Sequence, residues 1–140
     1  MPRELIQIIE NDPEYARLLE QAFQRAHYRT NIAYDGEAGV QAVRRLIPAL
    51  VVVDLTLPEL AAYRVCRLLQ KGLDTRRIPL LLITALDNPF YRAIAQQLGA
   101  DDLVTKPVNF QEIVERSTRL IRRTSSSQPL SDGIPTSRLA

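Results

Sequence analysis

Four polar residues of this sequence stand at the ends of apolar runs, where their reactive side chains would meet. Asp54 ends the run at residues 50–54, and Glu10, Thr84 and Lys106 follow similar runs. Runs rich in Val, Ile and Leu are typical of strands buried on both faces of a parallel sheet. Because open α/β folds keep their ligand sites at the carboxyl edge of such a sheet, we expect two carboxylates, a hydroxyl and an ammonium to form one site there.

The elements that position these residues alternate along the chain. We expect strands near residues 4–9, 29–34, 50–54, 79–84 and 102–106, where apolar residues run together. Apolar residues recur at helical spacing between them, near 13–26, 36–46, 60–71, 89–99 and 110–121. Five strand–helix units in succession predict an α/β fold with a doubly wound parallel sheet.

Short-range signals mark where several helices begin. Asp12-Pro13 and Asn88-Pro89 each supply an N-cap residue followed by a first-turn proline. Asn109 begins a capping-box-like start to the last helix. In the second helix we expect the apolar residues to share one face: Val40, Val43 and Ile47.

Composition and charge exclude several classes of protein. The net charge of +2 is too small to argue by itself for binding to nucleic acid or membranes. Cys66 is the only cysteine, so no internal disulfide forms, and we expect it to pack rather than react. Neither a signal peptide nor a membrane span is recognisable, so we expect a cytoplasmic protein. We assign residues 1–124 to one domain and 125–140, rich in Ser, Pro and Gly, to a disordered tail or linker.

The chain resembles a response-regulator receiver domain over about residues 4–123. The resemblance rests on four motifs, each at a strand end: Ile9-Glu10-Asn11-Asp12-Pro13, Asp54-Leu55-Thr56-Leu57-Pro58, Ile83-Thr84-Ala85 and Gly99-Ala-Asp-Asp-Leu-Val-Thr-Lys-Pro107. It implies a flavodoxin-like fold, with five parallel strands in the order 2-1-3-4-5 flanked by five helices. It also implies two-component signalling, in which Asp54 accepts a phosphoryl group from a histidine kinase or phosphotransfer protein.

The resemblance further implies a role for each site residue. Lys106 would hold one phosphoryl oxygen, and the Thr84 hydroxyl would hold another while moving the loop after its strand. The movement would switch a protein-interaction surface made by the fourth helix, fifth strand and fifth helix. The peptide bond between Lys106 and Pro107 is typically cis in this family. Magnesium would be bound by four residues: Glu10, Asn11, Asp54 and the backbone carbonyl of Thr56.

Three departures from the family pattern leave more than one hypothesis open. Asn11 stands where an aspartate is usual, so we expect weaker Mg²⁺ binding. Leu103 replaces an aromatic residue that often rotates inward on activation, and Glu59–Ala62 replaces a turn rich in Gly and Asp. The chain is therefore either a phosphorylation switch or a degenerate receiver that works only as a binding module. A phosphatase of the haloacid dehalogenase type would need an aspartate where Thr56 stands. We therefore expect no enzymatic activity other than self-phosphorylation and slow autodephosphorylation.

The last helix is rich in arginine, which raises the question of nucleic acid. Arginines near a helix C-terminus usually reflect the helix dipole and a solvated face. The helix carries four of them: Arg116, Arg119, Arg122 and Arg123. With no helix-turn-helix segment following, we expect no direct contact with nucleic acid and no membrane contact. A homodimer or partner surface formed by the fourth and fifth helices is the favoured hypothesis.

Overall fold

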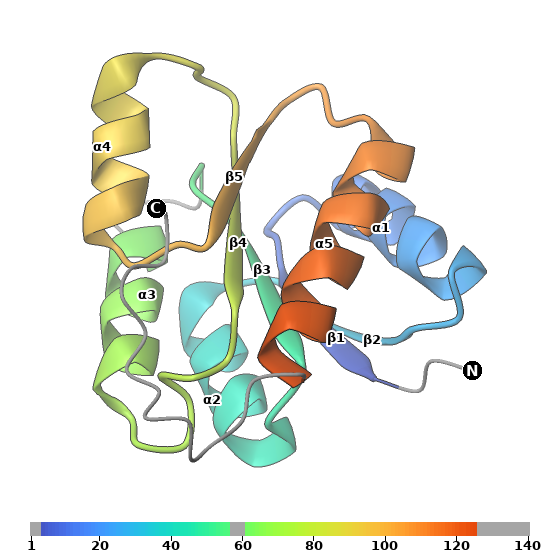
Figure 1. The fold of residues 1–140 in the computed structure, drawn as a ribbon, viewed down its shortest axis with the longest axis horizontal. Coiled ribbons are helices and arrows are strands. Elements are labelled where there is room, and N and C mark those ends of the chain that lie inside the picture. The colour runs from blue at the N-terminus through green and yellow to red at the C-terminus, as the bar shows by residue number, and fades with distance from the viewer. Residues whose placement is uncertain (1–3, 57–60, 126–140) are drawn as a thin grey trace.

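The computed structural model describes residues 4–56 and 61–125 of the 140-residue chain, and this part alternates strands with helices (Figure 1). The elements in chain order are β1 (Leu5–Ile9), α1 (Pro13–Arg25), β2 (Arg29–Ala33), α2 (Gly36–Leu46), β3 (Leu50–Asp54), α3 (Ala61–Lys71), β4 (Leu80–Thr84), α4 (Pro89–Gln97), β5 (Asp102–Thr105) and α5 (Phe110–Ser125). All strand pairs are parallel, in the order β2-β1-β3-β4-β5. The predicted doubly wound sheet and its order are confirmed.

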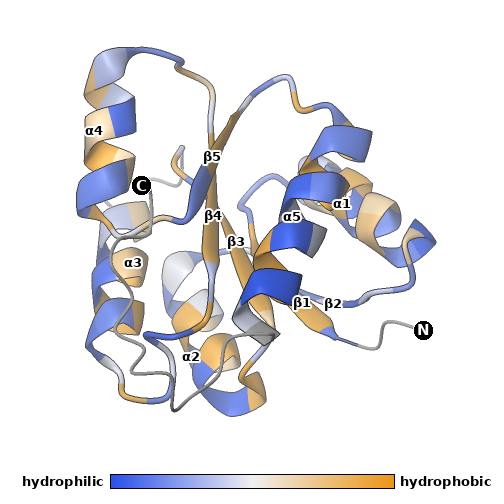
Figure 2. Ribbon diagram, in the orientation of Figure 1, coloured by the Kyte–Doolittle hydropathy of each residue, from blue (hydrophilic) through white to orange (hydrophobic). Residues whose placement is uncertain are grey.

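Helices cover both faces of the sheet, and alternate strand residues supply two apolar cores. Val51 and Val53 pack with α2, α3 and α4 on one face. Leu50 and Val52 pack with α1 and α5 on the other. Figure 2 shows the strands β1, β3 and β4 as an apolar layer between helices that carry polar residues on their outer sides. Among the described residues, no helix is long and apolar enough to cross a membrane.

The predicted helix starts are confirmed. Asp12 and Asn88 are N-caps followed by proline, and Oδ1 of Asp12 accepts a hydrogen bond from the Glu14 backbone N–H at 3.0 Å. Oδ1 of Asn109 accepts one from the Glu112 backbone N–H at 2.9 Å. These caps place the first turn of each helix beside the carboxyl end of the preceding strand.

One expectation about α2 is wrong. Ile47 does not lie on the apolar face of the helix but caps its C-terminus, with a left-handed φ of 44° and 46% exposure. The chain turns there because only two residues separate Ile47 from the start of β3. Cys66 packs in the core as expected, and burial raises the pKa of its thiol to about 12.

Two segments singled out in the sequence lie outside the described residues. They are residues 57–60, with Glu59 and its neighbours after β3, and residues 126–140, which fall within the predicted tail. Helix α5 itself continues through Ser125, one residue beyond the expected end of the domain.

Candidate functional site

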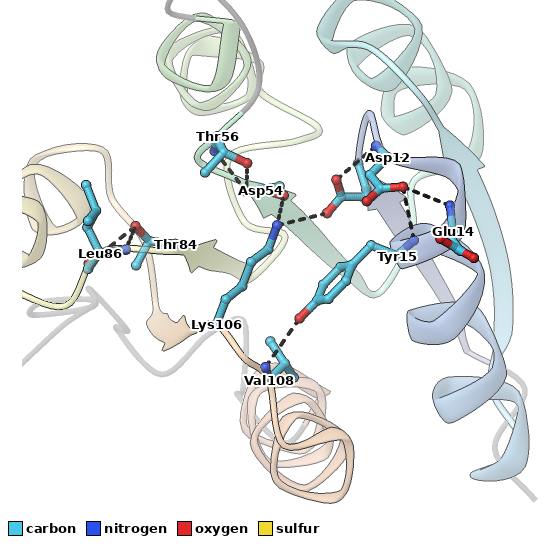
Figure 3. A network of polar contacts seen from close by, with 10 residues as sticks. Asp12, Glu14, Tyr15, Asp54, Thr56, Thr84, Leu86, Lys106 and Val108 are labelled. Carbon is cyan, nitrogen blue, oxygen red and sulfur yellow. Dashed lines mark hydrogen bonds and ion pairs between the residues drawn. The ribbon is translucent and has the colours of Figure 1, made fainter.

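Parallel strands end together, so the residues that end or follow β1, β3, β4 and β5 meet at one edge of the sheet. Asp54 ends β3, and Thr84 ends the neighbouring β4. Glu10 and Asp54 are each only 1% exposed, and Thr84 is also buried. Figure 3 shows Lys106 reaching from beyond β5 toward Asp54. The fold thus brings two buried carboxylates and one ammonium into a single cluster.

Asp54 accepts hydrogen bonds on both carboxylate oxygens. Lys106 donates its ammonium to Oδ2 at 2.7 Å, and Thr56 donates its backbone N–H and hydroxyl to Oδ1 at 2.8 and 2.7 Å. Burial alone would raise the pKa of Asp54, but hydrogen bonds, those from Glu10 and Lys106 foremost, hold it below its ordinary value. Asp54 is therefore an ionised carboxylate in a site largely closed to water.

Glu10 is the second carboxylate of the cluster, and its two oxygens differ. Oε2 accepts the backbone N–H of Asp12 at 3.0 Å. Oε1 is buried and has no hydrogen-bond donor within the described part of the chain, and the Lys106 ammonium lies 3.9 Å away. Burial, with a hydrogen bond to Asp54, raises the pKa of Glu10 to about 8. Burial thus favours the protonated form of Glu10.

The ammonium of Lys106 is held by charge. Burial disfavours its charged form, but the hydrogen bond to Asp54 and the nearby carboxylates outweigh burial and raise its pKa. The Lys106 ammonium thus lies within ion-pair distance of both Asp54 and Glu10. The peptide bond from Lys106 to Pro107 is cis, as the resemblance implies.

The oxygen-rich edge suits a hard cation better than a soft one. Mg²⁺ prefers carboxylate, carbonyl and water oxygens, and Oε1 of Glu10, which accepts no hydrogen bond from the described residues, is an oxygen of this kind. Asn11, the next residue, is exposed, and Asp12 is occupied as the cap of α1. Across residues 4–56 and 61–125, no three His, Cys, Asp or Glu residues are grouped to hold a metal ion. The donor set fits Mg²⁺ in its chemistry but carries fewer charges than a three-carboxylate site.

Thr84 lies at the predicted edge, but its hydroxyl contacts neither Asp54 nor Lys106. The oxygen accepts the backbone N–H of Leu86 at 3.1 Å and donates to the Leu86 carbonyl at 3.3 Å. Figure 3 shows this pair apart from the Asp54–Lys106 contact. In the form described here, Thr84 therefore shapes the loop between β4 and α4.

Two contacts at the site are not predicted from the sequence. The Thr56 hydroxyl bonds Asp54, although only the backbone carbonyl of Thr56 was expected to take part. The ring of Tyr15 also lies under the Lys106 ammonium, 4.4 Å from ring centroid to nitrogen. A signal existed for Tyr15, because it stands in the first turn of α1, three residues after the Asp12 cap, and that turn borders the strand edge.

Known proteins resemble this chain over most of its length. The family model for the response regulator receiver domain matches residues 6–118. The DNA-binding dual master transcriptional regulator RpaA of Synechocystis is 36% identical over 89% of this chain and 51% of its own length. The probable transcriptional regulator ycf27 of Porphyridium aerugineum is 34% identical over 91% of this chain and 52% of its own. The chain therefore spans about half the length of these curated relatives.

A solved structure shares the fold as well. The signal receiver domain of a histidine kinase from Syntrophus aciditrophicus superposes with a TM-score of 0.81 at 28% identity, covering 91% of this chain and 97% of that one. Because RpaA is described as DNA-binding, the prediction that this protein avoids nucleic acid finds no support among the relatives. Fold, edge motifs and family model agree, and the chain belongs to the response regulator receiver domains of two-component signalling.

Proposed function

We propose that this chain accepts a phosphoryl group on Asp54 from a histidine kinase or phosphotransfer protein and so switches a protein-interaction surface. The observation that carries the proposal is the 2.7 Å contact between the Lys106 ammonium and Asp54, a carboxylate buried at the strand edge beside Glu10. A module that only bound other proteins would need neither partner of that contact.

The transfer follows from the chemistry of the residues. An oxygen of Asp54 attacks the phosphorus of a phosphohistidine, the phosphorus–nitrogen bond breaks, and its electron pair returns to the imidazole. The lowered pKa keeps Asp54 ionised for this attack. Lys106 then exchanges the carboxylate for a phosphoryl oxygen, which it holds as a point charge. Thr56 already donates its hydroxyl to Oδ1 of the same carboxylate.

Glu10 and Asp54, with the Asn11 amide and the Thr56 backbone carbonyl, are the oxygens that would hold Mg²⁺. When bound, the ion offsets the repulsion between the two anions that react. We expect the ion to be held more weakly than in a site with a third carboxylate, because Asn11 carries no charge.

The switch would act through Thr84 and the face formed by α4, β5 and α5. The Thr84 hydroxyl can leave Leu86 for a phosphoryl oxygen, and the loop that begins α4 would move with it. A cavity of about 460 Å³ on this face is lined by residues such as Arg92, Asp102 and Arg116. A homodimer through this face, or a partner on it, would respond to the movement.

The proposed activity is signalling by phosphorylation rather than catalytic turnover of a substrate. Self-phosphorylation and slow autodephosphorylation are the expected chemical steps, and the cytoplasm is the expected compartment. The chain spans about half the length of RpaA, which is described as DNA-binding, and we propose that any DNA contact of a longer protein containing this chain would be made outside residues 1–140.

Intact-mass spectrometry tests the proposal. The wild type and Asp54→Asn are incubated with acetyl phosphate or phosphoramidate, with Mg²⁺ or with EDTA. One added phosphoryl group on the wild type, absent from Asp54→Asn and from the EDTA sample, is the expected result. Equal labelling of the two proteins would overturn the assignment. An unlabelled wild type with every donor would instead favour the phosphorylation-independent binding module.

A further inference from the structure

Tyr15 borders the site beside Lys106, and neither the sequence motifs nor the transfer chemistry assigns it a role. Its ring faces the Lys106 ammonium at 4.4 Å from centroid to nitrogen, on the α1 side of the cluster (Figure 3). An ammonium over the face of an aromatic ring is attracted by the ring quadrupole, more strongly where water is partly excluded. The Lys106 side chain is 23% exposed, so this attraction is only partly screened.

The far end of Tyr15 is fixed to the segment that follows Lys106. The phenol oxygen accepts the backbone N–H of Val108 at 3.3 Å, and the ring lies 6.1 Å from that of Phe110, centroid to centroid. Val108 is buried, and Phe110 begins α5. Tyr15 therefore joins α1 to the chain segment between β5 and α5, two residues beyond Lys106. The ring cannot leave the ammonium without disturbing these contacts.

We propose that Tyr15 is a positioning residue that holds the Lys106 ammonium against Asp54 and thereby sets the rate of phosphoryl transfer. The inference rests on the proposed function of Asp54. A lysine side chain has four rotatable bonds and a compact charge, so it needs partners on more than one side to keep one orientation. Asp54 supplies one partner at 2.7 Å and Tyr15 the other at 4.4 Å. Orientation prepared before the reaction lowers its barrier.

A purely structural role of Tyr15 would predict different results for its variants. If Tyr15 only filled space between α1 and α5, its loss would lower stability and leave the ammonium of Lys106 where it is. If Tyr15 positions Lys106, the aromatic face matters more than the hydroxyl, and phenylalanine replaces it while leucine does not. The two variants therefore separate the two roles.

Phosphorylation rates provide the first test. Wild type, Tyr15→Phe and Tyr15→Leu are phosphorylated with acetyl phosphate and Mg²⁺, and the modified fraction is followed by intact mass. Tyr15→Leu is expected to react about threefold to fivefold more slowly, the size of a partly solvated cation–π attraction. Tyr15→Phe is expected to stay close to the wild type. Tyr28→Leu is the matched control, because Tyr28 also contacts α1 and α5, through Phe23 and Thr118, but lies just before β2, away from the strand edge, and it is expected to leave the rate unchanged.

Nuclear magnetic resonance provides a second test that does not depend on phosphorylation. The ring should shift the ε-methylene resonances of Lys106 upfield in the wild type and in Tyr15→Phe, and Tyr15→Leu should lose the shift. The sequence holds one other lysine, Lys71, so Lys106→Arg assigns the signal. An unshifted Lys106 in the wild type, or a Tyr15→Leu rate equal to that of a reactive wild type, would overturn the inference. A wild type that shows the ring shift but takes no phosphoryl group would instead count against the function proposed for Asp54.

Discussion

Two ion clusters in this molecule have nearly the same geometry and very different surroundings. At the strand edge, Lys106 contacts Asp54 at 2.7 Å beside Glu10. On the face of β5 and α5, Arg116 contacts Asp102 at 2.8 Å and Glu112 at 3.0 Å. The carboxylates of the first cluster are 1% exposed, whereas the side chains of Asp102 and Glu112 are 26% and 47% exposed.

The two clusters differ in their protonation and in their contribution to stability because of burial, not because of distance. Water solvates both carboxylates around Arg116, so its ion pairs contribute little to stability whether made or broken. At the strand edge the carboxylates have lost water, and one ammonium cannot neutralise both. Glu10 consequently keeps a proton, and its Oε1 has no donor among the described residues. The buried cluster thus holds a carboxyl oxygen that a bound cation could take as a ligand, whereas the cluster around Arg116 does not.

The largest expected effect comes from removing the ammonium of the buried cluster. Lys106→Met leaves Asp54 ionised and buried without its cation, and we expect it to lower the free energy of unfolding by about 2–3 kcal/mol at pH 7.5 without Mg²⁺. Urea denaturation of both proteins measures the change. Lys71→Met, which removes the exposed lysine at the end of α3, is the control and should differ little from the wild type. If the two variants lost equal free energy of unfolding, the contact between Lys106 and Asp54 would contribute no more to stability than an exposed lysine does.

Glu10 gives the buried cluster a pH dependence of defined sign. Its folded pKa of about 8 lies above the ordinary value of 4.5. Between those values the unfolded chain releases this proton while the native protein keeps it, so this contribution to stability falls as the pH rises. Glu10→Gln removes the titration. In EDTA the stability of the variant relative to wild type should therefore rise from pH 5 to pH 8 and level off above it. A flat difference across that window would contradict the assignment.

Asn11 tests whether the cluster lacks a charge. Two unit charges about 4 Å apart interact by about 4 kcal/mol at an effective dielectric constant near 20, and exposure screens much of that. We expect Asn11→Asp to bind Mg²⁺ about tenfold more tightly, or about 1.4 kcal/mol, and to speed phosphorylation of Asp54. Magnesium titrations followed by tyrosine fluorescence compare the proteins, with Gln41→Glu on the exposed face of α2 as control. Unchanged affinity would mean that Asn11 does not face the ion.

The two regions also differ in how far the sequence predicts them. Strand ends and helix starts are local features, because a buried apolar run or a cap followed by proline acts within a few residues. The meeting of Glu10, Asp54 and Lys106 then follows, since parallel strands end at one edge. Polar residues inside elements are harder to foresee. Gln7 lies within the apolar run of β1, fully buried and with Oε1 unpaired in the described structure, and no pattern predicts it.

The directions in which side chains point are the other feature that the sequence patterns do not predict. The hydroxyl of Thr84 turns to Leu86, which depends on the local path of the loop after β4. The ring of Tyr15 meets Lys106, a residue far along the chain, only once α1 and β5 are assembled. Such contacts are decided by tertiary packing, and residue types at given spacings do not specify them.

The smallest expected effect belongs to the partly exposed cluster around Arg116. Arg116 touches two carboxylates at distances close to that of the Lys106 contact, so an argument from geometry alone would expect a similar loss on removal. Solvation argues otherwise, because Asp102 and Glu112 regain water when the guanidinium is gone, and exposed pairs are worth at most about 1 kcal/mol. We therefore expect Arg116→Met to lower the free energy of unfolding by about 0.5 kcal/mol. Arg119→Met, an exposed neighbour on α5, is the matched control. Urea denaturation of Arg116→Met, Arg119→Met and Lys106→Met measures the three losses in the free energy of unfolding under the same conditions. A loss from Arg116→Met as large as that from Lys106→Met would show that distance, and not burial, sets the strength of ion pairs in this protein.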